Sequence, residues 1–185
     1  GRTQDETIEM VLNKVIPAEA GLGGGSSNAA AALVGAATLW GVGVEDERVQ
    51  EVASRLGADV SFFLKGGCAR LSGKGDVFEA QLEPRSGFVL LVRPDAGVST
   101  GKAYAAFDED PVLPGSGYLS SIAALDAAAD VSLYNNLEKA ACSVTPVVAE
   151  VLEWGRAAAG EENVVLCGSG SAVCCIFDSY QAACE

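Results

Sequence analysis

The run from Pro17 to Ala30 joins a glycine-rich loop to an alanine-rich segment. Its centre reads Gly21-Leu22-Gly23-Gly24-Gly25-Ser26-Ser27. Glycines accept positive φ angles and let a ligand approach the backbone closely. The first amides of a helix have no partner inside it, and they lie at the positive end of its dipole, which makes a helix start a binding site for phosphate. The hydroxyls of Ser26 and Ser27 could add contacts to phosphate or to Mg²⁺.

The two common glycine-rich nucleotide motifs do not fit this loop. The Walker pattern needs a lysine before the serine, where Gly25 stands. The dinucleotide pattern GxGxxG fails because Ser26 or Asn28 occupies the place of its last glycine. A flexible connector ahead of a helix is the alternative. Three adjacent glycines, two serines and a helix start in a single run favour phosphate binding.

Asp59 is the candidate for proton transfer. It follows Gly57, the predicted C-cap of a helix over residues 45–56, and it precedes the apolar run Phe62-Phe63-Leu64. We expect a turn over 57–60 in which the carboxylate is partly removed from water. Such a carboxylate could accept a proton from a substrate hydroxyl within hydrogen-bond reach. Composition alone favours the alternative, an aspartate that caps a short turn.

The segments that must position these residues predict a mixed α and β chain. Strands are expected where apolar and polar residues alternate or where apolar runs are short: 7–15, 68–71, 77–82, 88–92 (a buried strand), 164–167 and 172–177. Helices are expected over 26–40 with serine N-caps, 45–56, 99–107, 119–129 and 146–159, with Thr145 as the N-cap of the last and Pro146 as its first residue. Asp178 and Ser179 are expected to cap a further helix. Residues 83–87 are the predicted linker.

Composition excludes several classes of protein. The 185 residues are 49% hydrophobic and 20% charged, as in globular domains, and the net charge is −13. An acidic chain repels nucleic acid and anionic lipid, so neither is an expected partner. The longest apolar stretch, 29–40, is too short to cross a bilayer. Six cysteines without a CxxC pair, and no histidine, argue against zinc and for a reduced, cytoplasmic location.

The glycine loop resembles the ATP-binding motif of the GHMP kinases, Pro-x-x-x-Gly-Leu-Gly-Ser-Ser-Ala. The extra glycines are most similar to the branch that phosphorylates the 2-hydroxyl of 4-diphosphocytidyl-2-C-methyl-D-erythritol in the non-mevalonate isoprenoid pathway. Leu56–Leu64 resembles the Leu-Gly-Ala-Asp-Val-Pro-Phe-Phe-Leu of that branch, with Ser61 in place of proline. Residues 94–104 and 168–172 resemble two further segments, and Asn135-Asn136-Leu137-Glu138 resembles Asn-Asp-Leu-Glu, to which no role is assigned.

The resemblance implies a role for each matching residue. Asp59 matches the catalytic base, and Tyr104 matches an aromatic residue that stacks on the cytosine, although its ring could equally pack in a core. The ATP contacts implied are Lys14, Pro17, Gly21, Leu22, Gly23, Gly24, Gly25, Ser26 and Ser27, with Gly168, Ser169 and Gly170 from the third motif. Lys14 could instead be an ordinary solvated lysine, and the third motif a plain tight turn.

The resemblance also implies a fold and a reaction. The fold is α/β (α+β) with two domains, predicted as 1–84 for ATP binding and 85–185 for the C-terminal domain, and an active site in the cleft between them. The cofactors implied are ATP and Mg²⁺, and the partner is a small cytidine diphosphate-linked substrate. We expect the chain to be an internal part of a kinase. Alternatives are a mevalonate or homoserine type of kinase, a nucleotide-binding module without catalysis, and a cysteine-based redox or metal protein. The oligomeric state stays open.

Overall fold

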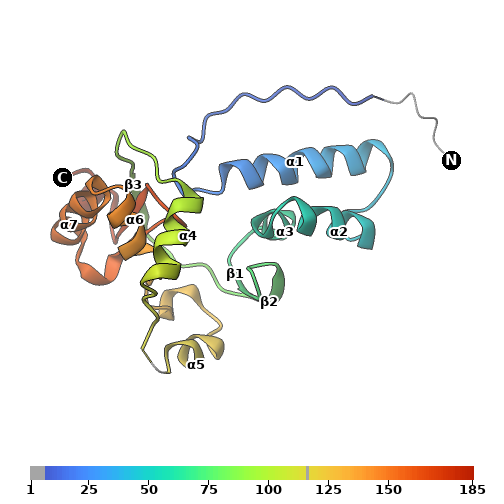
Figure 1. Ribbon diagram of the computed structural model, residues 1–185. Coiled ribbons are helices and arrows are strands. Elements are labelled where there is room, and N and C mark those ends of the chain that lie inside the picture. Colours follow the sequence, from blue (N-terminus) through green and yellow to red (C-terminus); the bar gives the residue numbers. More distant parts are fainter. Residues whose placement is uncertain (1–6, 116) are drawn as a thin grey trace. The chain divides into compact units, whose positions relative to one another are not determined.

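The computed structural model describes residues 7–115 and 117–185 (Figure 1). The chain forms two compact units that are not contiguous in sequence. The first holds the residues up to Ile16 together with Gly23–Ala80. The second holds Pro17–Leu22 together with Gln81–Glu185. The glycine loop is therefore divided between the two units at the bond from Leu22 to Gly23. The expected family domains, 1–84 and 85–185, stay a prediction.

The first unit is a set of three helices followed by a hairpin. The helices are α1 (Gly24–Leu39), α2 (Glu47–Leu56) and α3 (Ala58–Lys65), and the hairpin strands are β1 (Ala69–Ser72) and β2 (Val77–Gln81). One buried residue from each helix, Ala30, Ala53 and Val60, meets the others in a common core. Two of the three are alanines, whose short side chains let the helices approach closely.

Two local predictions for this unit are wrong. Residues 7–15 are not a strand, and Val11 is 90% exposed, because no described strand pairs with the segment. A strand needs a neighbour for its backbone hydrogen bonds, whatever its side-chain pattern. The turn expected over 57–60 is instead the start of α3: Gly57 ends α2 and immediately serves as the N-cap of α3.

The second unit is built on a three-stranded antiparallel sheet. β5 (Val173–Phe177) is central, between β3 (Phe88–Val92) and β4 (Val164–Leu166). The helices are α4 (Thr100–Glu109), α5 (Tyr118–Ala123), α6 (Glu138–Val144), α7 (Val147–Ala159) and α8 (Tyr180–Cys184), with short 3₁₀ turns at Ala128–Asp130 and Glu161–Asn163. The strands 88–92, 164–167 and 172–177, the helix over 99–107 and the cap at Ser179 are confirmed.

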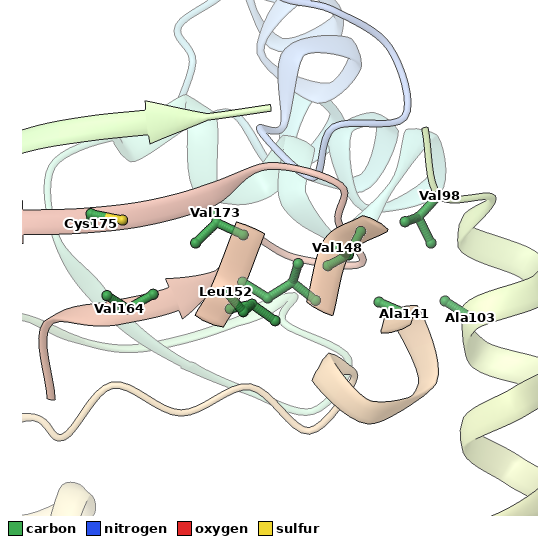
Figure 2. Close-up of a cluster of buried hydrophobic side chains, with 9 residues drawn as sticks. Val98, Ala103, Ala141, Val148, Leu152, Val164, Val173 and Cys175 are labelled. Carbon is green, nitrogen blue, oxygen red and sulfur yellow. The ribbon is translucent and has the colours of Figure 1, made fainter. Parts of the chain in front are cut away.

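The core of this unit lies between the sheet and its helices (Figure 2). Val173 and Cys175 alternate along β5 and are fully buried on one face. Leu152, on α7, is 2% exposed and belongs to the same cluster. Helices α4 and α6 contribute Ala103 and Ala141, which are fully buried in the same cluster. This core supports the turn that joins β4 to β5.

Other predictions for the second unit need correction. β3 is an edge strand, and three of its five residues are exposed, so it is not the buried strand that its apolar run indicated. The helix expected over 119–129 ends at Ala123. Helix α6 was not predicted. The N-cap residue of α7 is Pro146 rather than Thr145, whose hydroxyl donates to the carbonyl of Gly97. The linker is tied to residues 126–128 by the backbone of Glu83.

Candidate functional site

The start of α1 presents unpaired amides. Gly23 is the N-cap residue with a left-handed φ of 63°, and no side chain caps the helix. Within the described residues, the first intrahelical amide bond runs from Ser27 to Gly23. The amides of Gly24, Gly25 and Ser26 therefore point out of the helix start, where the dipole favours an anion.

The two serines lie inside the helix rather than at its cap, which corrects the prediction. The helix begins at Gly24 because a left-handed glycine can serve as N-cap without a Cβ clash. The hydroxyl of Ser27 donates to the carbonyl of Gly24 at 3.1 Å. The hydroxyl of Ser26 has no hydrogen-bond partner in the described part of the chain. Ser26 is thus the serine whose hydroxyl stays available for a ligand.

Lys14 lies beside this helix start. A Cβ atom built on Gly24 would be 2.7 Å from the Nζ atom of Lys14 and 2.7 Å from a methyl group of Ile16. The ammonium group and the three amides are therefore neighbours in the same unit. Gly24 is buried under these side chains, so a larger residue could not take its place without displacing Lys14. The positive charge and the helix dipole act in the same direction on any anion bound there.

Asp59 is positioned by α3. It lies in the first turn of that helix, and Val60 next to it is buried in the core of the first unit. Phe63 is four residues further on, on the same helix face. A Cβ atom at Gly23 would be 2.8 Å from the ring of Phe63. The face of α3 that carries Asp59 is therefore the face that reaches the N-cap of α1, about one helical turn away, or roughly 5.4 Å.

The environment of Asp59 differs from the expected one. The residue is exposed, so its carboxylate is not partly removed from water in this structure. Gly57 starts α3 directly, and this brings Asp59 to the open first turn rather than into an apolar turn. Its carboxylate has no hydrogen-bond or ion-pair partner among the described residues. A free carboxylate on this face is available to a substrate hydroxyl.

The first half of the glycine loop packs in the second unit. The carbonyl of Glu19 accepts hydrogen bonds from the amides of Val98 at 3.2 Å and Ser171 at 3.1 Å. The carbonyl of Ala20 accepts from Ala172 at 3.0 Å. Glu19 has a φ of 54°, which is unfavourable for a residue with a side chain and persists because these bonds hold it. Segment 17–22 is thus fastened to the turn between β4 and β5.

Two glycines make this close approach possible. Gly21 has a φ of 72°, and a Cβ atom on it would overlap the carbonyl oxygen of Cys167. A Cβ atom on Gly168 would lie 3.0 Å from the carbonyl oxygen of Gly21. The first and third matching motifs, about 150 residues apart in sequence, therefore touch backbone to backbone. The separate resemblance of each motif did not predict this contact.

Tyr104 and Thr100 lie on α4 in the second unit. Tyr104 is 53% exposed, which excludes the alternative that its ring is a core residue. The hydroxyl groups of Thr100 and Ser169 hydrogen-bond to each other at 2.9 Å. The start of α4 is therefore linked to the same turn as segment 17–22. An exposed ring one helical turn from this link is available for stacking.

Sequence reasoning assigned no role to Asn135, yet its side chain binds the turn. Its Nδ2 donates to the carbonyls of Leu166 at 2.8 Å and Gly168 at 2.7 Å. The match to the Asn-Asp-Leu-Glu pattern was the only signal that could have singled it out. Among the described residues, no three histidine, cysteine, aspartate or glutamate side chains are grouped so as to hold a metal ion.

Known proteins resemble the chain over most of its length. Residues 2–67 match the family described as GHMP kinases N terminal domain. A 4-diphosphocytidyl-2-C-methyl-D-erythritol kinase of Geobacter sp. strain M21 is 40% identical over 176 residues, which are 95% of this chain and 62% of the relative. The protein of the same name from Nocardioides sp. is 37% identical over 182 residues, 94% of this chain and 60% of the relative.

A solved structure has the same fold. The crystal structure of a 4-(cytidine 5'-diphospho)-2C-methyl-D-erythritol kinase matches with a TM-score of 0.66 and 33% identity, over 90% of this chain and 60% of that one. The α+β fold is therefore confirmed. The chain spans about 60% of the length of the curated relatives it matches. In the described part of the chain, no helix has the length and apolar character needed to cross a membrane.

Proposed function

We propose that this chain is a member of the GHMP kinase family, whose N-terminal domain its residues 2–67 match, and that it transfers the γ-phosphate of ATP to an alcohol. The acceptor we infer is the 2-hydroxyl of 4-diphosphocytidyl-2-C-methyl-D-erythritol, an intermediate of the non-mevalonate pathway. Support for this substrate comes from relatives of that name that are 37% and 40% identical over almost the whole chain. The triple glycine of the loop distinguishes this branch from mevalonate and homoserine kinases.

One observation carries the proposal: the start of α1 offers three unpaired amides beside the ammonium group of Lys14. This arrangement suits the terminal phosphates of a nucleotide. The hydroxyl of Ser26 is available for the same phosphates or for Mg²⁺. When bound with the nucleotide, Mg²⁺ neutralises charge on the β- and γ-phosphates. The described residues hold no acidic cluster for it, so the ion would depend mainly on phosphate oxygens and water.

The remaining candidates have complementary roles. Asp59 would orient the acceptor hydroxyl and take its proton, and its exposed carboxylate is free to do so. Tyr104 would stack on the cytosine through its exposed ring. Gly168, Ser169 and Gly170 would add backbone contacts to the phosphates, and Pro17 to Leu22 would hold that turn in place. Catalysis in this class is mostly positioning and charge stabilisation.

The expected partners are small molecules. Nucleic acid is disfavoured by the net charge of −13. The six cysteines include no CxxC pair, which suits the reduced, cytoplasmic location we propose.

A substrate panel tests the proposal. The 185-residue chain is incubated with γ-labelled ATP and Mg²⁺, and with 4-diphosphocytidyl-2-C-methyl-D-erythritol, mevalonate or homoserine. We expect label to appear only on the cytidyl substrate. Asp59→Asn should lower the rate by at least about 100-fold, in keeping with the usual contribution of a general base, while ATP affinity stays within twofold. Asp76→Asn is the matched control, since Asp76 lies in the hairpin turn and binds the amide of Lys74.

Three results would contradict the proposal in different ways. Label on mevalonate or homoserine would leave a kinase with another acceptor. ATP binding without transfer to any acceptor would leave a nucleotide-binding module. Full turnover by Asp59→Asn would remove the assignment of the base but not of the reaction.

A further inference from the structure

Asn135 uses both ends of its side-chain amide. Its Nδ2 group donates to the carbonyls of Leu166 and Gly168, and its Oδ1 accepts from the amide of Leu137 at 2.9 Å. The residue is half-buried just before α6. A primary amide can serve two acceptors and one donor at once, which a hydroxyl or a carboxylate cannot do.

These bonds fix the orientation of two peptide groups. In a trans peptide the C=O and the following N–H point in opposite directions. The carbonyl of Leu166 points to Asn135, and the amide of Cys167 accordingly points the other way, to the carbonyl of Ala172. The carbonyl of Gly168 also points to Asn135. The amide of Ser169 must therefore be directed away from Asn135.

The Ser169 amide is left without a partner. The next two amides of this turn have partners: the amide of Gly170 donates to the carbonyl of Cys167, and the amide of Ser171 donates to the carbonyl of Glu19. The Ser169 hydroxyl is engaged by Thr100. Among the described residues, nothing accepts a hydrogen bond from the amide of Ser169. The turn thus presents one oriented hydrogen-bond donor, the Ser169 amide, that is available to a ligand. The bonds to Asn135, Glu19 and Thr100 constrain the backbone that carries it.

We propose that Asn135 is a positioning residue that aims the Ser169 amide at a phosphate of the bound nucleotide. The inference rests on the proposed function, since it assumes that the turn meets a nucleotide. Asn135 itself does not touch the ligand. It acts by holding the carbonyl of Gly168, which has a φ of 50°. A glycine has no Cβ and tolerates many backbone conformations, so this peptide group could otherwise flip at little cost.

The test is a titration of the ¹⁵N-labelled chain with ATP, followed by amide NMR and by calorimetry. In the wild type the Ser169 amide should shift downfield as ATP binds. Asn135→Asp, which places a carboxylate against two carbonyl oxygens, should abolish this shift and weaken ATP binding on the order of tenfold, the effect of one charge-assisted hydrogen bond. Asn135→Ser is a milder change that keeps one donor, so its ATP affinity should lie between those of the wild type and Asn135→Asp. This variant replaces Asn135→Asp in the test if the aspartate variant does not fold.

Asn136→Asp is the matched control. It makes the same chemical change one residue further along, at a half-buried position with no hydrogen bond among the described residues, and ATP binding should be unchanged. A loss for Asn135→Asp with ATP, but not with adenosine, would separate a phosphate contact from general unfolding.

The outcomes distinguish this inference from the function on which it rests. If the wild type binds ATP but its Ser169 amide does not move at saturation, or if Asn135→Asp binds ATP as tightly as the wild type, the role of Asn135 is wrong and the kinase proposal stands. If the wild type does not bind ATP at all, both are overturned.

Discussion

Gly155 of α7 lies directly against Cys175 of β5. A Cβ atom on Gly155 would be 2.8 Å from the Sγ atom of Cys175 and 3.3 Å from a methyl group of Val164. Cys175 is fully buried and belongs to the main core of the second unit (Figure 2). The absence of a side chain on one partner thus sets how closely the helix packs on the central strand, which in turn supports the turn at Gly168.

The contact predicts that substitutions at the two positions are coupled. Gly155→Ala should destabilise the chain by about 1–2 kcal/mol, because overpacking outweighs the gain of a better helix former. Cys175→Ala removes the sulfur that is in the way. The double variant should therefore be more stable than the sum of the single changes by about 1 kcal/mol, as measured by urea unfolding. Gly35→Ala, in an open part of α1, is the control and should stabilise by about 0.5–1 kcal/mol.

Gly21→Ala should disrupt the backbone contact between segment 17–22 and the turn that joins β4 to β5, which we call the joint between the first and third motifs. Alanine at a φ of 72° is unfavourable by about 1–2 kcal/mol. Its Cβ would also overlap the carbonyl of Cys167, so one backbone must move. We expect a loss of at least about 2 kcal/mol in the free energy of unfolding, and faster hydrogen exchange at Ser171 and Ala172.

A second glycine in the same unit provides the comparison. Gly101, near the start of α4, has no atoms in the way of a Cβ. Gly101→Ala should leave stability unchanged or slightly higher. Equal effects of the two substitutions would show that the joint contributes nothing.

Asp46 should titrate well below an ordinary aspartate. Its carboxylate accepts hydrogen bonds from the side chain of Arg48 and caps α2 through the amide of Arg48, which lowers its pKa to about 2. A lowered pKa stabilises the fold at pH values above the ordinary value of 3.8, and this stabilisation is lost as the pH falls through about 2. The pair is exposed, so the effect on stability is small and is best seen by NMR titration of the carboxyl carbon.

Two variants check the cause of this low pKa. Arg48→Gln should bring the titration midpoint of Asp46 back toward 3.8, because the charge-assisted bonds are gone. Asp46→Asn keeps a good N-cap and should remove the acid-dependent part of the stability of α2. A midpoint that stays near 2 without Arg48 would contradict the assignment.

The cysteines should differ widely in reactivity. Cys184 is exposed, whereas Cys175 is buried. Burial, with a smaller contribution from Cys174 and Cys175, raises the pKa of the Cys167 thiol to about 12. At pH 8 only about one Cys167 in ten thousand would be a thiolate, the form that reacts. With iodoacetamide and peptide mapping, Cys184 should be labelled first, and Cys167 and Cys175 only after unfolding. Early labelling of Cys167 in the folded chain would contradict the burial.

Local sequence signals predicted a good part of this structure. Ser179 was expected to cap the last helix, and it accepts a hydrogen bond from the amide of Ala182. The strands around residues 164–177 and the glycine turn between them were also predicted, since the apolar runs and the turn residues are adjacent in sequence. The same holds for the glycine-rich loop that leads into α1, whose role in phosphate binding stays a prediction. Caps, turns and helix starts depend on atoms a few residues apart, so a sequence pattern is enough to specify them.

Contacts between distant segments were decided only by the tertiary structure. The alternation in 7–15 resembles a strand, but a strand exists only where another strand accepts its hydrogen bonds. The apolar run Phe88–Val92 predicts a buried strand, but the strand lies at the edge of the sheet and is therefore partly exposed to solvent. The hydrogen bond between Glu19 and Ser171 joins residues that are 152 positions apart, and the one between Asn135 and Gly168 joins residues that are 33 positions apart. Such pairings depend on which segments the whole fold brings together, and no local pattern carries that information.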